Sequence, residues 1–98
     1  MTSLYLVAEI YPHPDKHDEA HAALKKLVEA TQKETGCEMY ELVQEQDSGS
    51  WFMIEKWSSK ADWELHMTTD HVKEIQETSG EFLIKPADLR LFEPVSYA

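Results

Sequence analysis

The chain has 98 residues, 42% of them hydrophobic and 29% charged, and its formal net charge is −10. This length predicts one domain over 1–98 with a thin core, and small domains of this kind often associate to bury more surface. The acidity opposes binding to nucleic-acid phosphates, because the largest basic cluster is Lys25-Lys26. No apolar run approaches the ~18 residues of a membrane span. The single cysteine, Cys37, forms no internal disulfide, which fits a reducing cytoplasm.

The first half of the chain predicts a strand, a long helix and a hairpin. Residues 3–11 alternate and are rich in β-formers, and Pro12 and Pro14 end this strand. Asp15 is the expected N-cap of a helix that Gly36 terminates. Its apolar positions recur at helical spacing: Ala20, Ala23, Leu24, Leu27, Val28 and Thr31. Residues 37–46 and 51–57 alternate as two strands around an Asp-Ser-Gly-Ser turn, so they form a hairpin.

The second half predicts two helical segments and a last strand. Ser59, followed three residues later by Asp62, favours a short helix over 60–67, and a further helix follows Asp70 and stops before Pro86. Residues 87–94 alternate as the last strand. The order βαββαβ predicts a ferredoxin-like α+β sandwich, in which helices cover one face of a four-stranded antiparallel sheet.

Both faces of this sheet are apolar. In residues 51–57, Trp51, Met53 and Trp57 share one face with Glu55, while Phe52 and Ile54 occupy the other. The helices cover only one face, so a second sheet is the simplest cover for the other. We therefore predict a homodimer with its sheets packed face to face, and we expect Trp51, beside the turn, at this interface.

Several spaced residues carry a family resemblance. The run Gly36-Cys37-x-x-Tyr40-x-Leu42 precedes Phe52-x-x-Glu55-x-Trp57-x-Ser59-x-x-Asp62-x-x-x-His66, then His71 and Leu91-Phe92-Glu93-Pro94-Val95. This pattern, which spans nearly the whole chain, resembles the antibiotic biosynthesis monooxygenase domain. The resemblance implies a dimeric α+β barrel with a cofactor-free site between helices and sheet, walled by aromatic and histidine side chains. Members include quinol and polyketide-phenol monooxygenases and an enzyme that processes phospho-autoinducer-2.

The absence of asparagine from the chain separates it from two branches of this family. The aromatic polyketide oxygenases use an Asn and a Trp on the third strand and a later aromatic residue. Trp57 and Trp63 match the aromatic positions, but Met53 stands where the Asn would be. The haem-degrading branch uses an Asn on the first strand, and His66 stands where that branch has a Trp. Haem degradation is therefore not expected.

Two histidines are the candidate proton-transfer groups. His66 follows Trp63 by three residues and precedes Asp70 by four, so a shared helix face would put a carboxylate in reach. Such a histidine can act as a general base toward a phenol or enediol proton. His71, at the start of the next helix, is the second candidate. The alternative is structural: His66 hydrogen-bonded in the helix–sheet seam, and His71 in helix packing.

Glu55 is the third catalytic candidate. It either has a raised pKa and transfers protons or pairs across the dimer with Lys56, Lys85 or Arg90, and the pairing is slightly favoured. The substrate-binding candidates are Trp57, Trp63, Tyr40, Met53 and Met67. In this interpretation Trp57 and Trp63 wall a pocket for a planar substrate, Tyr40 lies near its mouth with Tyr11, and Met39 packs with the other two methionines around the cavity. Core packing is the alternative for the aromatic residues.

No metal site is expected. His13, His17 and His21 are four residues apart, but the spacing brings no fourth protein ligand to them, so a solvated first helical turn is favoured. Cys37 has only Lys33 nearby to lower its pKa, which favours a buried, inert thiol.

These residues favour cofactor-independent oxygenation of a quinol or phenolic compound, because such a substrate, once deprotonated, can pass an electron to O₂ by itself. One alternative is isomerase-type processing of a small phosphorylated carbonyl compound by the same histidine and glutamate. The acidity of the chain counts against a phosphate substrate. The other alternative is a non-catalytic, stress-responsive dimer that binds a hydrophobic ligand.

Overall fold

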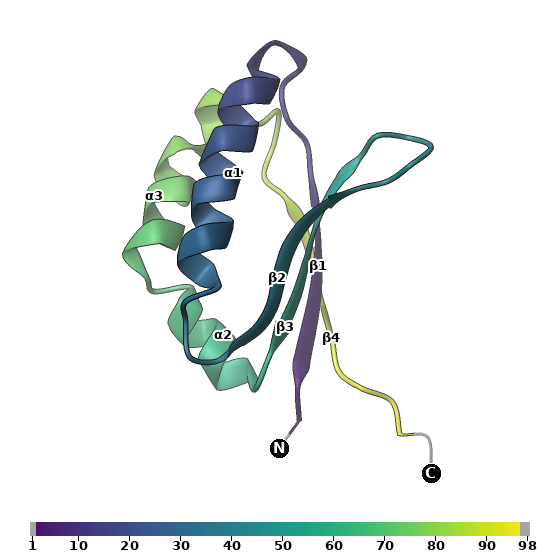
Figure 1. The fold of residues 1–98 in the computed structure, drawn as a ribbon, viewed down its shortest axis with the longest axis vertical. Coiled ribbons are helices and arrows are strands. Elements are labelled where there is room, and N and C mark those ends of the chain that lie inside the picture. Colours follow the sequence, from purple (N-terminus) through teal and green to yellow (C-terminus); the bar gives the residue numbers. More distant parts are fainter. Residues whose placement is uncertain (1, 97–98) are drawn as a thin grey trace.

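The computed structural model describes residues 2–96. Its strands are β1 (Leu4–Ile10), β2 (Cys37–Gln44), β3 (Trp51–Trp57) and β4 (Asp88–Phe92). Its helices are α1 (His17–Thr31), α2 (Lys60–His66) and α3 (Asp70–Thr78), with 3₁₀ turns η1 (Pro14–Lys16) and η2 (Ser79–Glu81). The strands form one antiparallel sheet in the order β2-β3-β1-β4, and the helices lie on one side of it (Figure 1). The predicted ferredoxin-like α+β fold is therefore confirmed.

The core lies between the helices and the inner face of the sheet. Alternate residues of β3 are buried, and their neighbours on β1 are buried with them: Leu4 opposite Trp57, Leu6 opposite Glu55 and Ala8 opposite Met53. Directly opposed residues of an antiparallel pair share a face, so these side chains form one layer. Ala20, Leu24 and Leu27 of α1 close the layer from the helical side.

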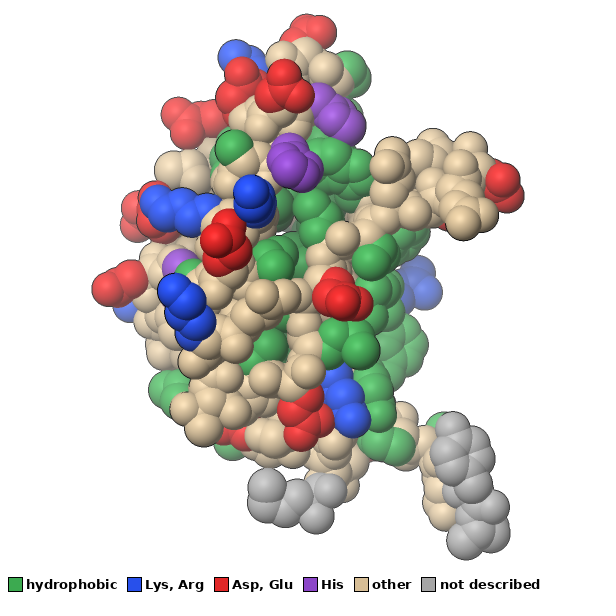
Figure 2. Space-filling view, viewed as in Figure 1, with side chains coloured by type: hydrophobic (Ala, Val, Ile, Leu, Met, Phe, Trp, Pro, Cys, Tyr) green, Lys and Arg blue, Asp and Glu red, His purple; other side chains and the backbone are tan. Residues whose placement is uncertain are grey.

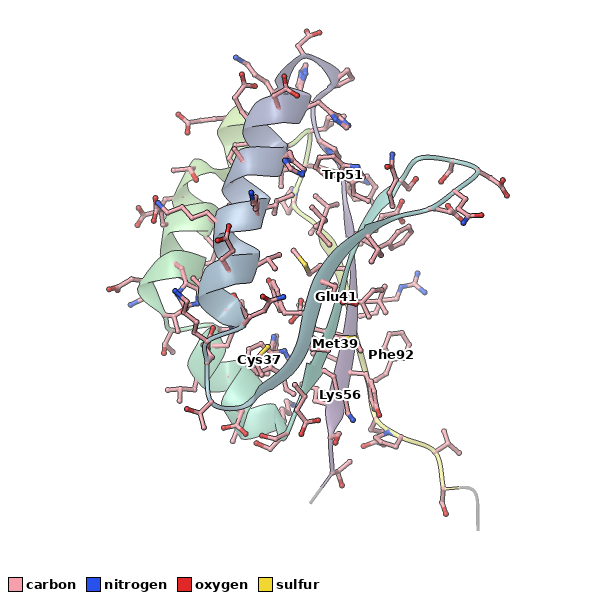
Figure 3. The ribbon with its side chains drawn as sticks, in the orientation of Figure 1. Cys37, Met39, Glu41, Trp51, Lys56 and Phe92 are labelled. Atoms are coloured by element: carbon pink, nitrogen blue, oxygen red, sulfur yellow. The ribbon has the colours of Figure 1, made fainter. Side chains whose placement is uncertain are left out.

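Trp51 belongs to this inner layer and not to a dimer interface. It pairs with Ile10, is 6% exposed, and its ring meets the His17 ring edge-on at 4.5 Å between centroids (Figure 3). The interface prediction was wrong because the first turn of α1 extends over the hairpin end of β3 and covers this tryptophan.

The observed helix N-caps match the ones predicted from the sequence at α2 but not at α1. The Ser59 hydroxyl accepts the Asp62 N–H at 3.1 Å and caps α2, as predicted, and Thr69 caps α3 through the Val72 N–H. Asp15, in contrast, lies inside η1, and Lys16 occupies the N-cap position of α1 without a side-chain cap. The proline at the start of η1 produces a tight turn that moves the helix start beyond Asp15.

Gly36 acts through a close contact and not through a left-handed helix end. α1 already ends at Thr31. Of the glycines within residues 2–96, only Gly49, in the hairpin turn, has a positive φ. A Cβ at Gly36 would overlap the Asp62 side chain, and the Gly36 carbonyl accepts the Ser58 N–H at 2.9 Å. The α1–β2 connection is thereby docked on the start of α2.

The outer face of the sheet has no cover within the described chain. Tyr5 and Phe92, which are directly opposed on β1 and β4, are 39% and 46% exposed. Figure 2 shows hydrophobic side chains along this side of the molecule. Within residues 2–96, no helix is both long and apolar enough to cross a lipid bilayer.

Candidate functional site

His66 and His71 bind the same carboxylate oxygen. The distance from Glu34 Oε2 to His66 Nδ1 is 2.7 Å, and to His71 Nε2 it is 2.8 Å. Glu34 lies in the α1–β2 connection, His66 is the last residue of α2, and His71 is in the first turn of α3. The Thr69 hydroxyl donates to the His66 carbonyl oxygen at 2.7 Å and bends the chain between the two helices. This bend places the two imidazole rings 5.9 Å apart.

The environment of His66 favours its neutral form. The residue is 3% exposed, and burial lowers its pKa, although the hydrogen bond to Glu34 opposes that shift. A neutral imidazole that donates from Nδ1 to Glu34 has its lone pair on Nε2. His66 is therefore held in the tautomer that accepts a proton at Nε2.

Two predicted aromatic residues surround the His66 ring. The Trp57 ring lies 4.6 Å from it at an interplanar angle of 39°, and the Tyr40 ring lies 5.6 Å from it. Trp57 is fully buried and Tyr40 is 5% exposed. Burial raises the pKa of Tyr40 well above its ordinary value, so its phenol stays protonated. Beside it lies the buried Thr31 hydroxyl, whose interaction with the Tyr40 phenol opposes that shift.

Glu55 is connected to this cluster through Trp57, whose indole N–H donates to Glu55 Oε1 at 3.0 Å. Glu55 is 5% exposed, and burial raises its pKa to about 7 against the lowering effect of that hydrogen bond. The favoured prediction of an ion pair across the dimer was wrong, because Glu55 faces the helices. Lys56, on the opposite face, pairs instead with Glu38 at 3.4 Å.

The remaining predicted residues are distributed unevenly. Met53 is buried in the core, and Trp63 and Met67 pack against it while partly exposed. Met39 is 41% exposed on the outer face, away from the core that holds Met53, because the register between β2 and β3 shifts between residues 37 and 39. Tyr11 lies beyond the opposite end of β1, where its hydroxyl donates to Asp88.

The carboxylate of the site was assigned to the wrong residue from sequence. Asp70 shares no helix with His66, because α2 ends at His66 and α3 begins at Asp70. Glu34 takes that place and was missed, since a glutamate in a Lys-Glu-Thr-Gly connection is typical of a solvated loop. The available signal was Gly36, whose close contact with Asp62 draws this connection onto α2.

The pocket expected around Trp57 and His66 is closed, because these side chains are 0% and 3% exposed. The site reaches solvent through its other members: the side chains of Glu34 and His71 are 17% and 25% exposed. A small hollow of about 50 Å³ between α1 and α3 ends at His71. A larger hollow of about 470 Å³ lies elsewhere, between α1 and the edge strand β2.

Cys37, at the start of β2, lies between the helices and the sheet (Figure 3). Burial, with Glu34 and Glu55 nearby, raises the pKa of its thiol to about 11. The thiol is therefore protonated at neutral pH and is a poor nucleophile.

Known proteins share both the sequence pattern and the fold. The sequence profile of the antibiotic biosynthesis monooxygenase family matches residues 3–78. "Putative monooxygenase Rv0793" of Mycobacterium tuberculosis is 27% identical over 100% of this chain and 98% of its own, and the solved Rv0793 structure has a TM-score of 0.89. A conserved protein from Methanosarcina mazei Go1 is 31% identical, with 94% and 92% of the two chains covered and a TM-score of 0.87. The chain belongs to the antibiotic biosynthesis monooxygenase family.

Proposed function

We propose that this protein is a cofactor-independent monooxygenase of a quinol or phenolic small molecule, with His66 as the general base. The observation that carries the proposal is the buried His66 ring, held at Nδ1 by Glu34 at 2.7 Å and packed against Trp57. A general base needs an unprotonated nitrogen with a free lone pair. Burial lowers the pKa of His66 and so keeps its ring neutral, which leaves that lone pair on Nε2. The aromatic side chains around this closed pocket suit a planar substrate, whose binding requires the side chains that bury His66 to move aside.

The reaction needs no external reductant. His66 removes the phenolic proton, the phenolate gives one electron to O₂, and the two radicals combine to form a C–O bond at an unsubstituted ring carbon. The resulting peroxide anion takes the phenolic proton back from His66 and becomes a hydroperoxide. The hydroperoxide loses the proton on the oxygenated carbon while its O–O bond breaks, and the departing hydroxide takes up a proton and leaves as water. A phenol and O₂ thus give a quinone and water, and the substrate supplies all four electrons.

Glu55 fits the second proton transfer of this sequence. Its pKa of about 7 leaves it partly protonated at neutral pH, so it can give a proton to the departing hydroxide and take one back. The hydrogen bond from the Trp57 indole N–H holds the Glu55 carboxyl beside that indole nitrogen. The His66 ring packs against the same tryptophan.

We propose in addition that two copies associate through the outer face of the sheet. The family is typically dimeric, and this face carries Tyr5, Val43 and Phe92, each at least 39% exposed. Exposed apolar side chains gathered on one face of a small domain are typical of an interface. A cytoplasmic location remains a prediction from the single cysteine.

The alternative of a phosphorylated carbonyl substrate has less support. A phosphate needs a cation near the histidine, but Lys56 pairs with Glu38 on the outer face, and the Lys85 ammonium lies 4.3 Å from the Tyr11 ring centre. Ligand binding without catalysis would leave a buried glutamate with a pKa of about 7 without a role.

Oxygen consumption tests the proposal. A panel of hydroquinones and phenols is incubated with the wild-type protein in an oxygen electrode, with His66→Ala as the test variant and His21→Ala, an exposed histidine of α1, as the matched control. We expect uptake that falls by about 10²-fold or more in His66→Ala only. One atom of ¹⁸O₂ should enter the product without release of hydrogen peroxide. Uptake equal in wild type and His66→Ala would refute the proposal.

A further inference from the structure

We propose that Glu34, His66 and His71 bind one divalent transition-metal ion. Glu34 Oε2 lies 2.7 Å from His66 Nδ1 and 2.8 Å from His71 Nε2, and the three atoms all lie within 4.8 Å of one another. Two imidazoles and one carboxylate form a donor set that suits zinc, cobalt and nickel better than magnesium or calcium, which prefer oxygen ligands alone. The inference goes beyond the proposed function and is tested without turnover.

The three ligands are already oriented toward one point. His66 is fixed by burial and by its contact with the Trp57 ring, and its carbonyl oxygen accepts the Thr69 hydroxyl at 2.7 Å. The backbone that carries Glu34 is held by the docking of its loop, in which the Gly36 carbonyl accepts the Ser58 N–H. A pre-organised donor set loses little conformational freedom on binding, so the ion meets a small ordering cost.

Small movements convert the hydrogen-bonded cluster into a metal site. Tetrahedral ligands at about 2.1 Å from zinc are about 3.4 Å from each other, so the Glu34 carboxylate would retreat by roughly half an ångström. Its position in a loop, with 17% of the side chain exposed, allows this. The histidines bind as neutral rings, and each proton that now lies between a ring and Glu34 moves to the other ring nitrogen.

The open side of the cluster provides the entry path and the remaining ligand. His71 is the most exposed of the three, at 25% of its side chain, so an ion can arrive from solvent and keep a water molecule there. The net charge of −10 also favours the approach of cations.

Metal binding and base catalysis need different tautomers of the His66 imidazole. An ion on Nδ1 leaves the proton of His66 on Nε2, which removes the lone pair that the proposed reaction needs. If the proposed function is correct, the metal-free protein is the active form and the ion is an inhibitor.

Titration of the tag-free, full-length protein with Zn²⁺ and Co²⁺ tests the site. After removal of bound metal with a chelator, calorimetry gives the stoichiometry, and the visible spectrum of Co²⁺ reports the ligand geometry. The test variants are Glu34→Gln and His71→Ala, which avoid the buried histidine. The matched control is the double variant His17→Ala/His21→Ala, which removes two exposed histidines of α1. Circular dichroism checks that each variant is folded.

We expect one ion per chain, at least tenfold weaker binding in both test variants, and unchanged binding in the control. Nitrogen NMR of His66 should show its ring proton move from Nδ1 to Nε2 when Zn²⁺ is added. Binding that survives both test variants, binding that only the control abolishes, or the absence of heat and of Co²⁺ bands would each overturn the proposal.

Discussion

Two tryptophan–histidine pairs lie at the two ends of β3. Their rings are almost equally far apart, but the pairs differ in the burial of the histidine and in their carboxylate partners. The Trp51 and His17 rings are 4.5 Å apart, and the Trp57 and His66 rings are 4.6 Å apart. His17 is exposed on the first turn of α1, whereas His66 is buried and binds Glu34. The indole N–H of Trp57 is also bonded to a buried glutamate. Ring proximity alone therefore does not mark a site; burial together with carboxylate partners does.

The largest expected effect concerns Glu55, the buried carboxyl at the Trp57 end. Its pKa is raised from 4.5 to about 7, so between these values the native state keeps a proton that the unfolded chain loses. The stability that the neutral carboxyl contributes is present below pH 4.5 and is lost as the pH rises through 7. A shift of this size corresponds to about 3 kcal/mol.

Glu55→Gln cannot ionise, so its free energy of unfolding should not fall between pH 5 and pH 8 as that of the wild type does. Denaturant unfolding at both pH values, at one protein concentration, should show its stability rise relative to wild type by about 2.5 kcal/mol across this range. The control is Glu41→Gln, an exposed strand glutamate, which should follow the wild type. Parallel curves for Glu55→Gln and wild type would mean that Glu55 is not neutral in the folded protein.

A second prediction concerns the α1–β2 connection, which brings Glu34 to the Trp57 end of β3 and not to the Trp51 end. In Gly36→Ala the new Cβ overlaps Asp62, and the loop that carries Glu34 must move away from α2. We expect a loss of about 1–3 kcal/mol in stability, the usual cost of overpacking, and reduced oxygen uptake because Glu34 no longer orients His66.

The matched control is Gly80→Ala, because a Cβ at Gly80 meets no atom within 4 Å. It should be nearly neutral in both stability and oxygen uptake. If Gly36→Ala were equally neutral, the docking of this loop would have no part in forming the site.

The same contrast shows how far the sequence alone could lead. Alternation and turn residues predicted the fold, and they placed Glu55 on one face with Trp51 and Trp57. They did not show which face the helices cover, because both faces are apolar, and this led to the errors at Trp51 and Glu55. Glu34 was beyond their reach, since its role depends on how a loop meets a helix 32 residues away in sequence.

The smallest predicted effect compares the two indoles directly. Trp57→Phe keeps an aromatic ring beside His66 but removes the N–H that bonds Glu55, whereas Trp51→Phe, the matched control, leaves the Glu55 hydrogen bond intact. Because that hydrogen bond lowers the pKa of Glu55, Trp57→Phe should raise it further above 7, and Trp51→Phe should leave it unchanged.

Losing a hydrogen bond to a charged group costs about 1.5–3 kcal/mol, and less where the glutamate is already neutral. Both variants lose some packing, so we expect the free energy of unfolding of Trp57→Phe to fall by roughly 1 kcal/mol more than that of Trp51→Phe near pH 7. Carboxyl carbon NMR of Glu55 across pH 5–9 measures the shift directly. An unchanged titration in Trp57→Phe would show that the indole does not tune this carboxyl, and the two tryptophan ends would then differ only through His66 and Glu34.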